Sequence, residues 1–199
     1  LNNNQLTNLP DNICNLPETF HLFLSNNKIC STIPSCMYWI NKQDCGDINC
    51  PENLVEINED CYYQSDLDVL QDIIDVNESL SGEEPLEIGS QEWTDGRLTY
   101  LSLSSNQLTT LPESIGNFSS LTELSLNSNH LTTLPDSIGN LSSLEWLRLH
   151  FNQLTSLPES IGNLSSLEYL GLYDNQFTTL PESICNLPET CHIYLYNNY

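Results

Sequence analysis

Eight cysteines are the side chains of this sequence most able to do chemistry, and their spacing favours disulfide bonds. Zinc sites commonly use Cys-x-x-Cys pairs, and the sequence holds no such pair. Disulfides persist in oxidising compartments, so we expect a secreted, extracellular or cell-surface protein. The disulfide candidates are the six cysteines nearest the start of the chain: Cys14, Cys30, Cys36, Cys45, Cys50 and Cys61.

Sequence signatures of catalysis are missing. The sequence has no Gly-rich phosphate loop, no Gly-x-Ser-x-Gly and no His-Glu-x-x-His. Fourteen acidic residues and no basic residue lie between Glu52 and Asp95, but they form no Asp-x-Asp-x-Asp-Gly calcium loop. A solvated acidic face is the preferred interpretation of this segment. We therefore expect no catalytic residues, no metal site and no cofactor.

Four Asn-x-Ser sequences are candidate N-glycosylation sites, which agrees with an extracellular location. They begin at Asn77, Asn117, Asn140 and Asn163. The last three also belong to a recurring Gly-Asn-x-Ser-Ser sequence, so the repeats by themselves could account for them. Both interpretations stay open at this point.

Four copies of a 23-residue unit span residues 98–189, and the fold of this unit decides where its side chains lie. Within each copy the first six residues alternate between apolar and variable, which predicts a short strand with leucines pointing inward. Each copy then continues as Asn-x-Leu/Phe-Thr-x-Leu-Pro-Glu/Asp-Ser-Ile-Gly/Cys-Asn. One unit cannot bury its leucines alone, so we expect the units to stack around a continuous core.

This pattern resembles the leucine-rich repeat, in its 23-residue Leu-Pro-x-x-Ile-Gly-Asn-Leu subclass. The resemblance implies an α/β solenoid with a parallel sheet on the concave face, irregular or 3-10 convex segments, and capped ends. It also implies that the Asn at the ninth position bonds backbone groups of neighbouring units. These residues are Asn106, Asn129, Asn152, Asn175 and Asn198.

The chain divides into three predicted segments. We interpret residues 1–50 as the end of one repeat array with a cysteine-rich C-terminal cap. Cys14 and Cys36 are one candidate bridge there, and six cysteines allow 15 complete pairing schemes, so the pairing stays open. Residues 51–97 are expected to form an N-terminal cap, with a helix at about 66–77 that begins in a Ser65 capping box. Residues 98–199 form a second array, which we expect to be cut before its C-terminal cap.

A longer period relates the two arrays. Residues 1–28 and 172–199 are identical at 17 of 28 positions, including Cys14 with Cys185 and His21 with His192. Residues 172–199 match residues 149–176, one 23-residue unit earlier, at only 14 positions, and these features are then lost. The sequence therefore predicts a larger tandem unit, of which one copy extends from Leu1 to Gly171.

Outward strand positions become aromatic along the second array, whereas the early ones are small and polar. Trp, Tyr and Arg dominate protein-binding hot spots, so these positions are candidate partner contacts. The alternative is that the rings only stack on one another, on a cap or on a neighbouring module. The candidates are Trp146, Arg148, His150, Tyr169, Tyr173, Tyr194 and Tyr196.

A net charge of −23, from four basic and 27 acidic residues, disfavours nucleic acid and anionic membranes as partners. No apolar run in the sequence is long enough to span a membrane. The first hypothesis is a non-enzymatic extracellular structural or interaction protein, one unit of a tandem chain that forms or decorates a fibre or cell-surface layer. Its partners would be copies of itself or adjacent modules. The alternative is a secreted or ectodomain recognition module that binds a protein or glycan on its concave face.

Overall fold

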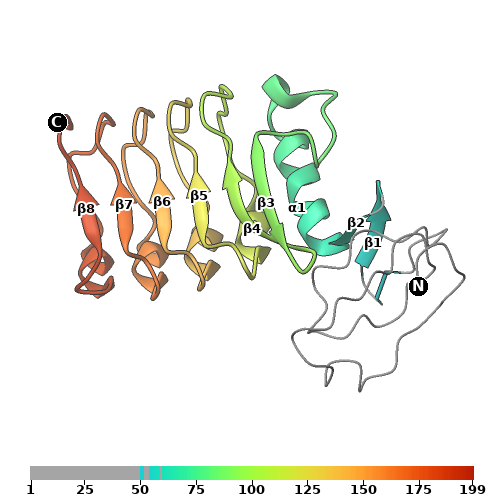
Figure 1. The fold of residues 1–199 in the computed structure, drawn as a ribbon. Coiled ribbons are helices and arrows are strands. Elements are labelled where there is room, and N and C mark those ends of the chain that lie inside the picture. The colour runs from blue at the N-terminus through green and yellow to red at the C-terminus, as the bar shows by residue number, and fades with distance from the viewer. Residues whose placement is uncertain (1–49, 52–53, 59) are drawn as a thin grey trace, which may run out of the picture. The chain divides into compact units, whose positions relative to one another are not determined.

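The computed structural model describes residues 50–51, 54–58 and 60–199. The predictions made above for residues 1–49, including Cys14, Cys30, Cys36 and Cys45, lie outside the described residues. The chain divides into two units, which are residues 1–52 with 56–61 and residues 53–55 with 62–199. The second unit holds the repeats, and it is a solenoid (Figure 1).

Each repeat of the solenoid contributes one short strand and one 3-10 helix. The strands β4 to β8 pair in parallel and in chain order, and the 3-10 helices η4 to η7 line the opposite face (Figure 1). The strands are β4 Arg97–Ser102, β5 Glu123–Ser125, β6 Trp146–Arg148, β7 Tyr169–Gly171 and β8 His192–Tyr194. The 3-10 helices are η4 Glu113–Asn117, η5 Asp136–Asn140, η6 Glu159–Asn163 and η7 Glu182–Asn186. The α/β solenoid expected from the sequence is confirmed.

The core of the solenoid is made of stacked leucines and isoleucines. In the central rungs Leu124, Leu147 and Leu170 from the strands and Ile138 and Ile161 from the 3-10 helices are all fully buried. A proline precedes each 3-10 helix in extended backbone, which sets the start of the convex segment. The period of two in the strands and the Leu-Pro signal therefore produce the two faces of each rung.

Buried asparagines tie one rung to the next. The Oδ1 atom of Asn152 accepts a hydrogen bond from the Leu131 amide at 3.0 Å, and its Nδ2 atom donates to the carbonyls of Leu126 and Leu149 at 2.9 and 3.0 Å. Asn129 and Asn175 make the same set of bonds in their rungs. Buried backbone N–H and C=O groups need hydrogen-bond partners. In the loops after the strands these asparagine side chains supply the hydrogen bonds that a sheet would otherwise supply.

The first end of the core is covered by a hairpin and a helix. Strand β3 Ser90–Thr94 pairs antiparallel with β4, and Asp95 and Gly96 form the turn with positive φ, as an Asp-Gly hairpin requires. Helix α1 Gln64–Asp75 buries Leu70 and Ile73 in the core cluster. Trp93 also packs against this core, and its Nε1 atom donates to Gln91 Oε1 at 3.0 Å. A short 3-10 helix, η3 Glu78–Leu80, follows α1.

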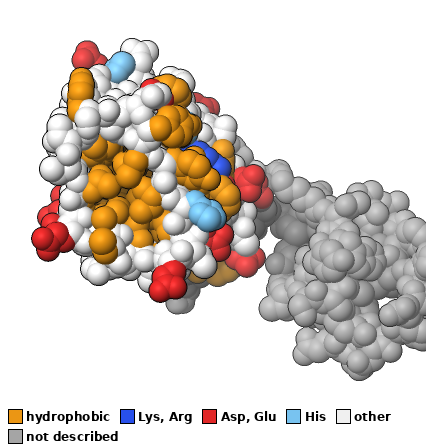
Figure 2. Space-filling model, turned by 90° about the vertical axis from the view of Figure 1, so that its left-hand side faces the viewer, with side chains coloured by type: hydrophobic (Ala, Val, Ile, Leu, Met, Phe, Trp, Pro, Cys, Tyr) orange, Lys and Arg blue, Asp and Glu red, His pale blue; other side chains and the backbone are white. Residues whose placement is uncertain are grey.

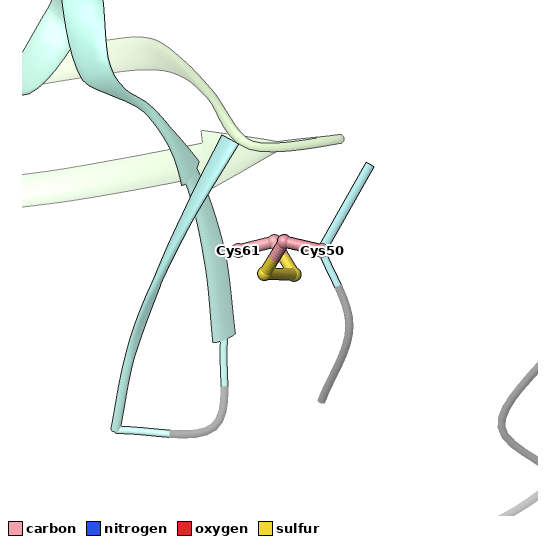
Figure 3. Close-up of a disulfide and its surroundings, with 2 residues drawn as sticks. All are labelled: Cys50 and Cys61. Atoms are coloured by element: carbon pink, nitrogen blue, oxygen red, sulfur yellow. A yellow bond between two sulfur atoms is a disulfide. The ribbon is translucent and has the colours of Figure 1, made fainter. Parts of the chain in front are cut away.

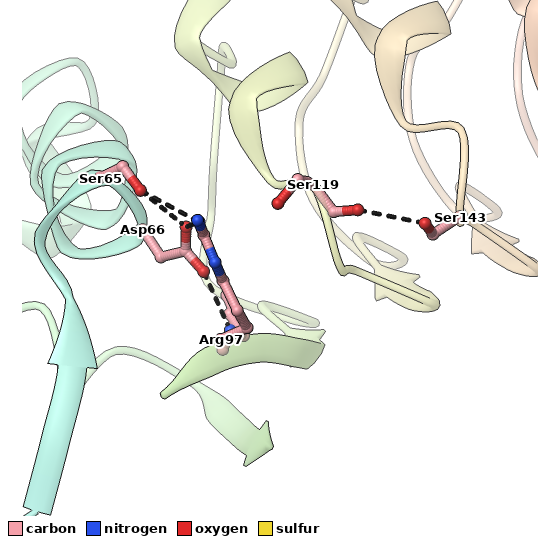
Figure 4. A network of polar contacts seen from close by, with 6 residues as sticks. Ser65, Asp66, Arg97, Ser119 and Ser143 are labelled. Carbon is pink, nitrogen blue, oxygen red and sulfur yellow. Dashed lines mark hydrogen bonds and ion pairs between the residues drawn. The ribbon is translucent and has the colours of Figure 1, made fainter. Parts of the chain in front are cut away.

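Helix α1 begins and ends two residues earlier than expected, and Ser65 does not cap it. Its N-cap is Tyr63, which makes no side-chain cap hydrogen bond. Asp66 inside the first turn explains the difference, because it is fully buried and accepts hydrogen bonds from Arg97 at 2.7 Å and from the Leu98 amide at 3.0 Å (Figure 4). The guanidinium of Arg97 also covers the Tyr63 ring at 3.6 Å. The contacts of the buried Asp66 carboxylate with the partly exposed Arg97 and with the Leu98 amide therefore set the register of α1.

A disulfide joins Cys50 and Cys61, two of the six candidates, with a Cα to Cα distance of 5.6 Å (Figure 3). Strands β1 Leu54–Ile57 and β2 Asp60–Tyr63 form a two-stranded sheet. Cys185 and Cys191, in the last rungs of the solenoid, are free thiols.

The four glycosylation candidates lie in different environments. Asn77 is 2% exposed, and its Nδ2 atom donates to the carbonyls of Ile73 and Thr110 while its Oδ1 atom accepts from the Thr109 amide. A glycan on Nδ2 does not fit this arrangement, so we correct the expectation for Asn77. The other three are exposed at the ends of η4, η5 and η6 and stay candidates: Asn117, Asn140 and Asn163.

Candidate partner-binding surface

The outward residues of the sheet change character along the solenoid. One register column runs Tyr100, Glu123, Trp146, Tyr169 and His192. In the early rungs the neighbouring outward positions carry small polar side chains, and a hydrogen bond of 2.7 Å joins Ser104 to Asn127. From β6 onward rings replace them. The aromatic side chains therefore gather on the last three rungs.

Two stacks of rings run across these rungs. In the first, Trp146 stacks on Tyr169 with centroids 5.2 Å apart, and Tyr169 lies 5.0 Å from Tyr194. Tyr194 is the register partner of Gly171, not of Tyr169. A Cβ atom on Gly171 would lie 3.0 Å from Cε1 of the Tyr169 ring. The absent side chain thus lets this ring lean toward Tyr194 and continue the stack.

The second stack consists of His150, Tyr173 and Tyr196, with centroid separations of 4.3 and 4.5 Å. Their planes are inclined by only 13° and 12°. His150 is buried, and its Nδ1 atom has no hydrogen-bond partner among the described residues. The stacking expected as the alternative is therefore present, and it orders the rings without covering their outer edges.

Phe151 joins this surface in an unusual backbone conformation. It has a φ of 55° and is 51% exposed, and its ring contacts those of His150 and Tyr173 edge to face. The equivalent positions of the other rungs also have positive φ, but they carry Ser105, Ser128, Asp174 and Asn197. A bulky residue is costly in this left-handed region, whereas Asn and Asp tolerate it. Local stability does not explain the choice of phenylalanine here.

One ion pair lies between the two stacks. Arg148 pairs with Glu123 and donates to Ser125 Oγ at 3.0 Å. Its guanidinium lies 5.4 and 5.7 Å from the ring centroids of Trp146 and Tyr169, within cation–π range. The pair leaves the centre of this surface near electrical neutrality, in a chain with a net charge of −23.

The surface changes the pKa of several groups. Burial and then the positive charge of Arg148 lower the pKa of His150 below 6.5, with Asp174 acting in the opposite direction. Burial raises the pKa of Tyr169 and of Tyr173 above 10.0. The histidine is therefore neutral and the tyrosines keep their hydroxyl protons at neutral pH, which suits stacked rings without net charge.

Lowering the pH from 7.5 to 5.5 is expected to reduce the free energy of unfolding of this protein more than that of its His150→Gln variant. Below about pH 6.5 His150 of the unfolded chain binds a proton, whereas its lowered pKa keeps it neutral in the folded chain. The contribution of His150 to the free energy of unfolding is therefore complete above about pH 6.5 and is lost as the pH falls toward the folded-state pKa. Urea unfolding across this pH series measures the difference. Parallel pH profiles for the two proteins would contradict the effect.

All seven candidates from the sequence lie on these rungs, and together with Phe151 and Glu123 we call them the aromatic surface. Phe151 was not among the sequence candidates because it directly follows the outward His150 and therefore falls on the inward parity of the alternating pattern. A signal existed, since phenylalanine occupies a column otherwise made of Ser, Asp and Asn. Among the described residues no cluster of three or more His, Cys, Asp or Glu side chains is arranged to hold a metal ion.

Two family models match the repeats. A model described as a leucine-rich repeat region matches residues 96–174, and a model described as a leucine-rich repeat matches residues 166–187. Residues 96–187 are leucine-rich repeats. In repeat proteins of this kind, stacked repeats create extended concave binding surfaces.

Several solved structures resemble this chain. One from Leptospira interrogans has 44% identity and a TM-score of 0.49, and the match covers 50% of this chain and 26% of that protein. The ectodomain of the receptor kinase SOBIR1 from Arabidopsis thaliana has 24% identity and a TM-score of 0.52, over 68% of this chain and 93% of that one. The BIR3–SERK2 complex of the same plant matches at 20% identity and a TM-score of 0.40, over 65% and 96%.

The likeness to the SOBIR1 ectodomain supports the leucine-rich repeat fold and goes no further. A comparison with curated protein sequences finds no match. Among the described residues no helix has the length and apolar character needed to cross a membrane.

Proposed function

We propose that this leucine-rich repeat chain is a non-enzymatic extracellular interaction module that binds a protein partner on its aromatic surface. Phe151 is the observation that carries the proposal. An exposed apolar ring in a left-handed backbone position costs stability, and such strain is tolerated where the side chain serves a function. The surrounding Trp, Tyr and Arg side chains are the types that dominate protein-binding hot spots.

The stacking favours a protein over a glycan as the partner. Sugars bind to open ring faces, but Tyr169 and Tyr173 have neighbouring rings on both sides of their planes. Between the ends of the stacks, the surface consists of ring edges, hydroxyl groups and the Arg148–Glu123 pair. Only the end rings, such as Trp146 and Tyr194, have a ring face without a stacked neighbour. Such a mixed apolar and polar surface matches the composition of protein interfaces.

An extracellular location is supported by two features. The Cys50–Cys61 disulfide is typical of oxidising compartments. In addition, Asn117, Asn140 and Asn163 expose N-glycosylation sequences on the side opposite the sheet. Glycans there would leave the aromatic surface open.

A structural role is the second candidate, because residues 1–28 match residues 172–199 at 17 of 28 positions. A tandem array of such units, forming or decorating a fibre or cell-surface layer, would use the aromatic surface for contacts between copies or adjacent modules. Filaments of the isolated protein in electron micrographs, with loss of those filaments in Trp146→Ala, would favour this role over recognition of a different protein.

Binding is tested with a photoreactive phenylalanine analogue at position 151, which captures the partner from native extracellular material. The affinity of that partner for the unlabelled chain is then measured. We expect Trp146→Ala to weaken binding about 30-fold, since hot-spot residues contribute roughly 2 kcal/mol. Phe151→Asn should weaken it about tenfold, as a peripheral apolar contact of roughly 1.4 kcal/mol would.

The control separates binding from folding. Phe151→Asn should not lower the free energy of unfolding, because Asn is favoured at this backbone position. Thr155→Ala, exposed away from the strands, should change neither quantity. Unchanged affinity in both aromatic variants would refute binding through this surface, and capture of a glycan alone would refute a protein partner.

A further inference from the structure

The middle of the aromatic surface has a gap at Gly171, which lies in the sheet between Arg148 of β6 and Tyr194 of β8. The guanidinium of Arg148 does not cover this position, because it turns back to Glu123 and Ser125 of β5. Of the strands β4 to β8, only β7 has no side chain at this position. We call this place the Gly171 gap.

The Tyr169 ring leans over the Gly171 gap. A Cβ atom on Gly171 would lie 3.0 Å from Cε1 and 3.1 Å from the hydroxyl oxygen of this ring. The ring plane is inclined by 32° to that of Tyr194, whereas the other stacked pairs are inclined by 12° to 16°. The register column of Tyr169 contains Trp146 and His192. The ring can therefore return to its own column, keep its stack on Trp146 and lose only the tilted contact with Tyr194, which opens the gap.

A buried imidazole nitrogen faces the same gap. The Cβ position of Gly171 lies 3.3 Å from Nδ1 of His150. His150 is 9% exposed, and its Nδ1 has no hydrogen-bond partner among the described residues. The parallel stack on Tyr173 and the edge contact with Phe151 hold the imidazole in place. Since an unpaired buried polar atom destabilises a folded protein, a fixed one beside a gap indicates that its partner comes from outside the chain.

The group that fits Nδ1 is a hydrogen-bond donor. His150 is neutral at neutral pH, so only one of its two ring nitrogens carries a hydrogen. Nε2 is not among the buried unpaired atoms, and it can donate that hydrogen to water. This arrangement leaves Nδ1 as an acceptor, and only a donor can satisfy it.

Charged groups are disfavoured at the gap. A carboxylate has no hydrogen to donate at neutral pH, and a cation would lose its hydration in a partly buried site beside the guanidinium of Arg148. Seen from the β8 end, hydrophobic side chains occupy the centre with a basic side chain beside them, and acidic side chains lie at the periphery (Figure 2). Basic groups of a partner are therefore matched at the periphery, and a short uncharged side chain suits the gap.

We propose that a short uncharged side chain of the protein partner, such as serine, threonine or asparagine, enters the Gly171 gap and donates a hydrogen bond to Nδ1 of His150. The Tyr169 ring moves back into its register column to admit it. This inference rests on the proposed function, because it needs a protein bound on the aromatic surface. A site built around a buried acceptor discriminates strongly, since a partner without the donor leaves Nδ1 unpaired. The gap is thus the specificity-determining subsite of the aromatic surface.

The gap is tested first without a partner, by comparing Gly171→Ser with Gly171→Ala in the full chain. Both variants place a Cβ atom in the gap, but only serine brings a hydroxyl group that can donate to Nδ1. Nitrogen NMR of chains with isotope-labelled histidine should show Nδ1 of His150 as a free acceptor in the unmodified chain and in Gly171→Ala, and as a hydrogen-bonded acceptor in Gly171→Ser. The thermal midpoint of Gly171→Ser should exceed that of Gly171→Ala by about 2–4 °C, and a His150→Phe background should remove this difference.

The second arm uses the protein captured at position 151 as the probe. Adding it to the unmodified chain should move the Nδ1 signal toward its position in Gly171→Ser. The affinity of this protein for Gly171→Ser should be about tenfold lower than for the unmodified chain, because the introduced hydroxyl group already satisfies Nδ1 and occupies the gap. Trp146→Ala is measured in parallel, because it removes a contact of the aromatic surface outside the gap.

An Nδ1 signal that is protonated or hydrogen-bonded in the free unmodified chain would overturn the proposal, as would equal spectra of the serine and alanine variants. Unchanged affinity of Gly171→Ser, together with weaker binding of Trp146→Ala, would overturn the subsite and leave the proposed function standing. Unchanged affinity of both variants would refute the proposed function as well.

Discussion

Replacing Asn152 by Ala is expected to lower the free energy of unfolding by about 4 kcal/mol. The side chain is 8% exposed and bonds the Leu131 amide and the carbonyls of Leu126 and Leu149. Both carbonyls keep a second asparagine donor, from Asn129 or Asn175. The amide loses its partner in the interior, which costs roughly 1–3 kcal/mol, and the two lost carbonyl bonds and the cavity add the remainder.

Asn198→Ala is the matched control for this prediction. Asn198 makes the equivalent bonds, to the Phe177 amide and to the carbonyls of Leu172 and Leu195, but it lies in the last rung, where it is partly exposed. Water can replace its hydrogen bonds, so we expect a loss of about 1 kcal/mol. Urea unfolding followed by circular dichroism measures both. Equal losses in the two variants would show that burial does not govern the contribution of these asparagines.

Gly139→Ala is expected to cost about 3 kcal/mol. The new Cβ atom would approach the Ser160 carbonyl oxygen to 2.2 Å and its Cβ atom to 2.7 Å. Both neighbours are held by the backbone of the next rung, so the two rungs must separate, and overpacking of this kind typically costs roughly 1–3 kcal/mol. Thermal and urea unfolding of the variant give the measurement.

Cys185→Ala is the control at the equivalent position of the last rung. Its side chain is exposed, so the substitution should change the free energy of unfolding by less than about 0.5 kcal/mol. A Gly139→Ala variant as stable as Cys185→Ala would mean that the rungs adjust to a side chain at this position.

The aromatic surface stands out because of one property of a solenoid. Each rung repeats the same backbone, so side chains at equivalent positions form columns, and a change in one column stands out against its neighbours. Phe151 departs from a column of Ser, Asp and Asn, and Cys185 departs from a column of glycines. The first of these departures marks the aromatic surface.

The repeat, its solenoid fold, the inward leucines and the column of asparagines could all be predicted from the amino-acid sequence. These features follow from periodic local patterns, because identical units can bury their apolar faces only by stacking. The seven outward candidates could likewise be named from strand alternation, since side chains of a strand alternate between its two faces.

The contacts between rungs, and those of the hairpin and helix α1 at the first end of the core, became known only from the folded chain. The burial of Asp66 with Arg97 moved the start of α1, and the hydrogen bonds of Asn77 removed it from the glycosylation candidates. The lean of Tyr169 over Gly171 joined rings from different register columns. Neither the period of two in the strands nor the 23-residue repeat predicts which of these side chains and backbone groups meet, because their geometry depends on how complete rungs pack together.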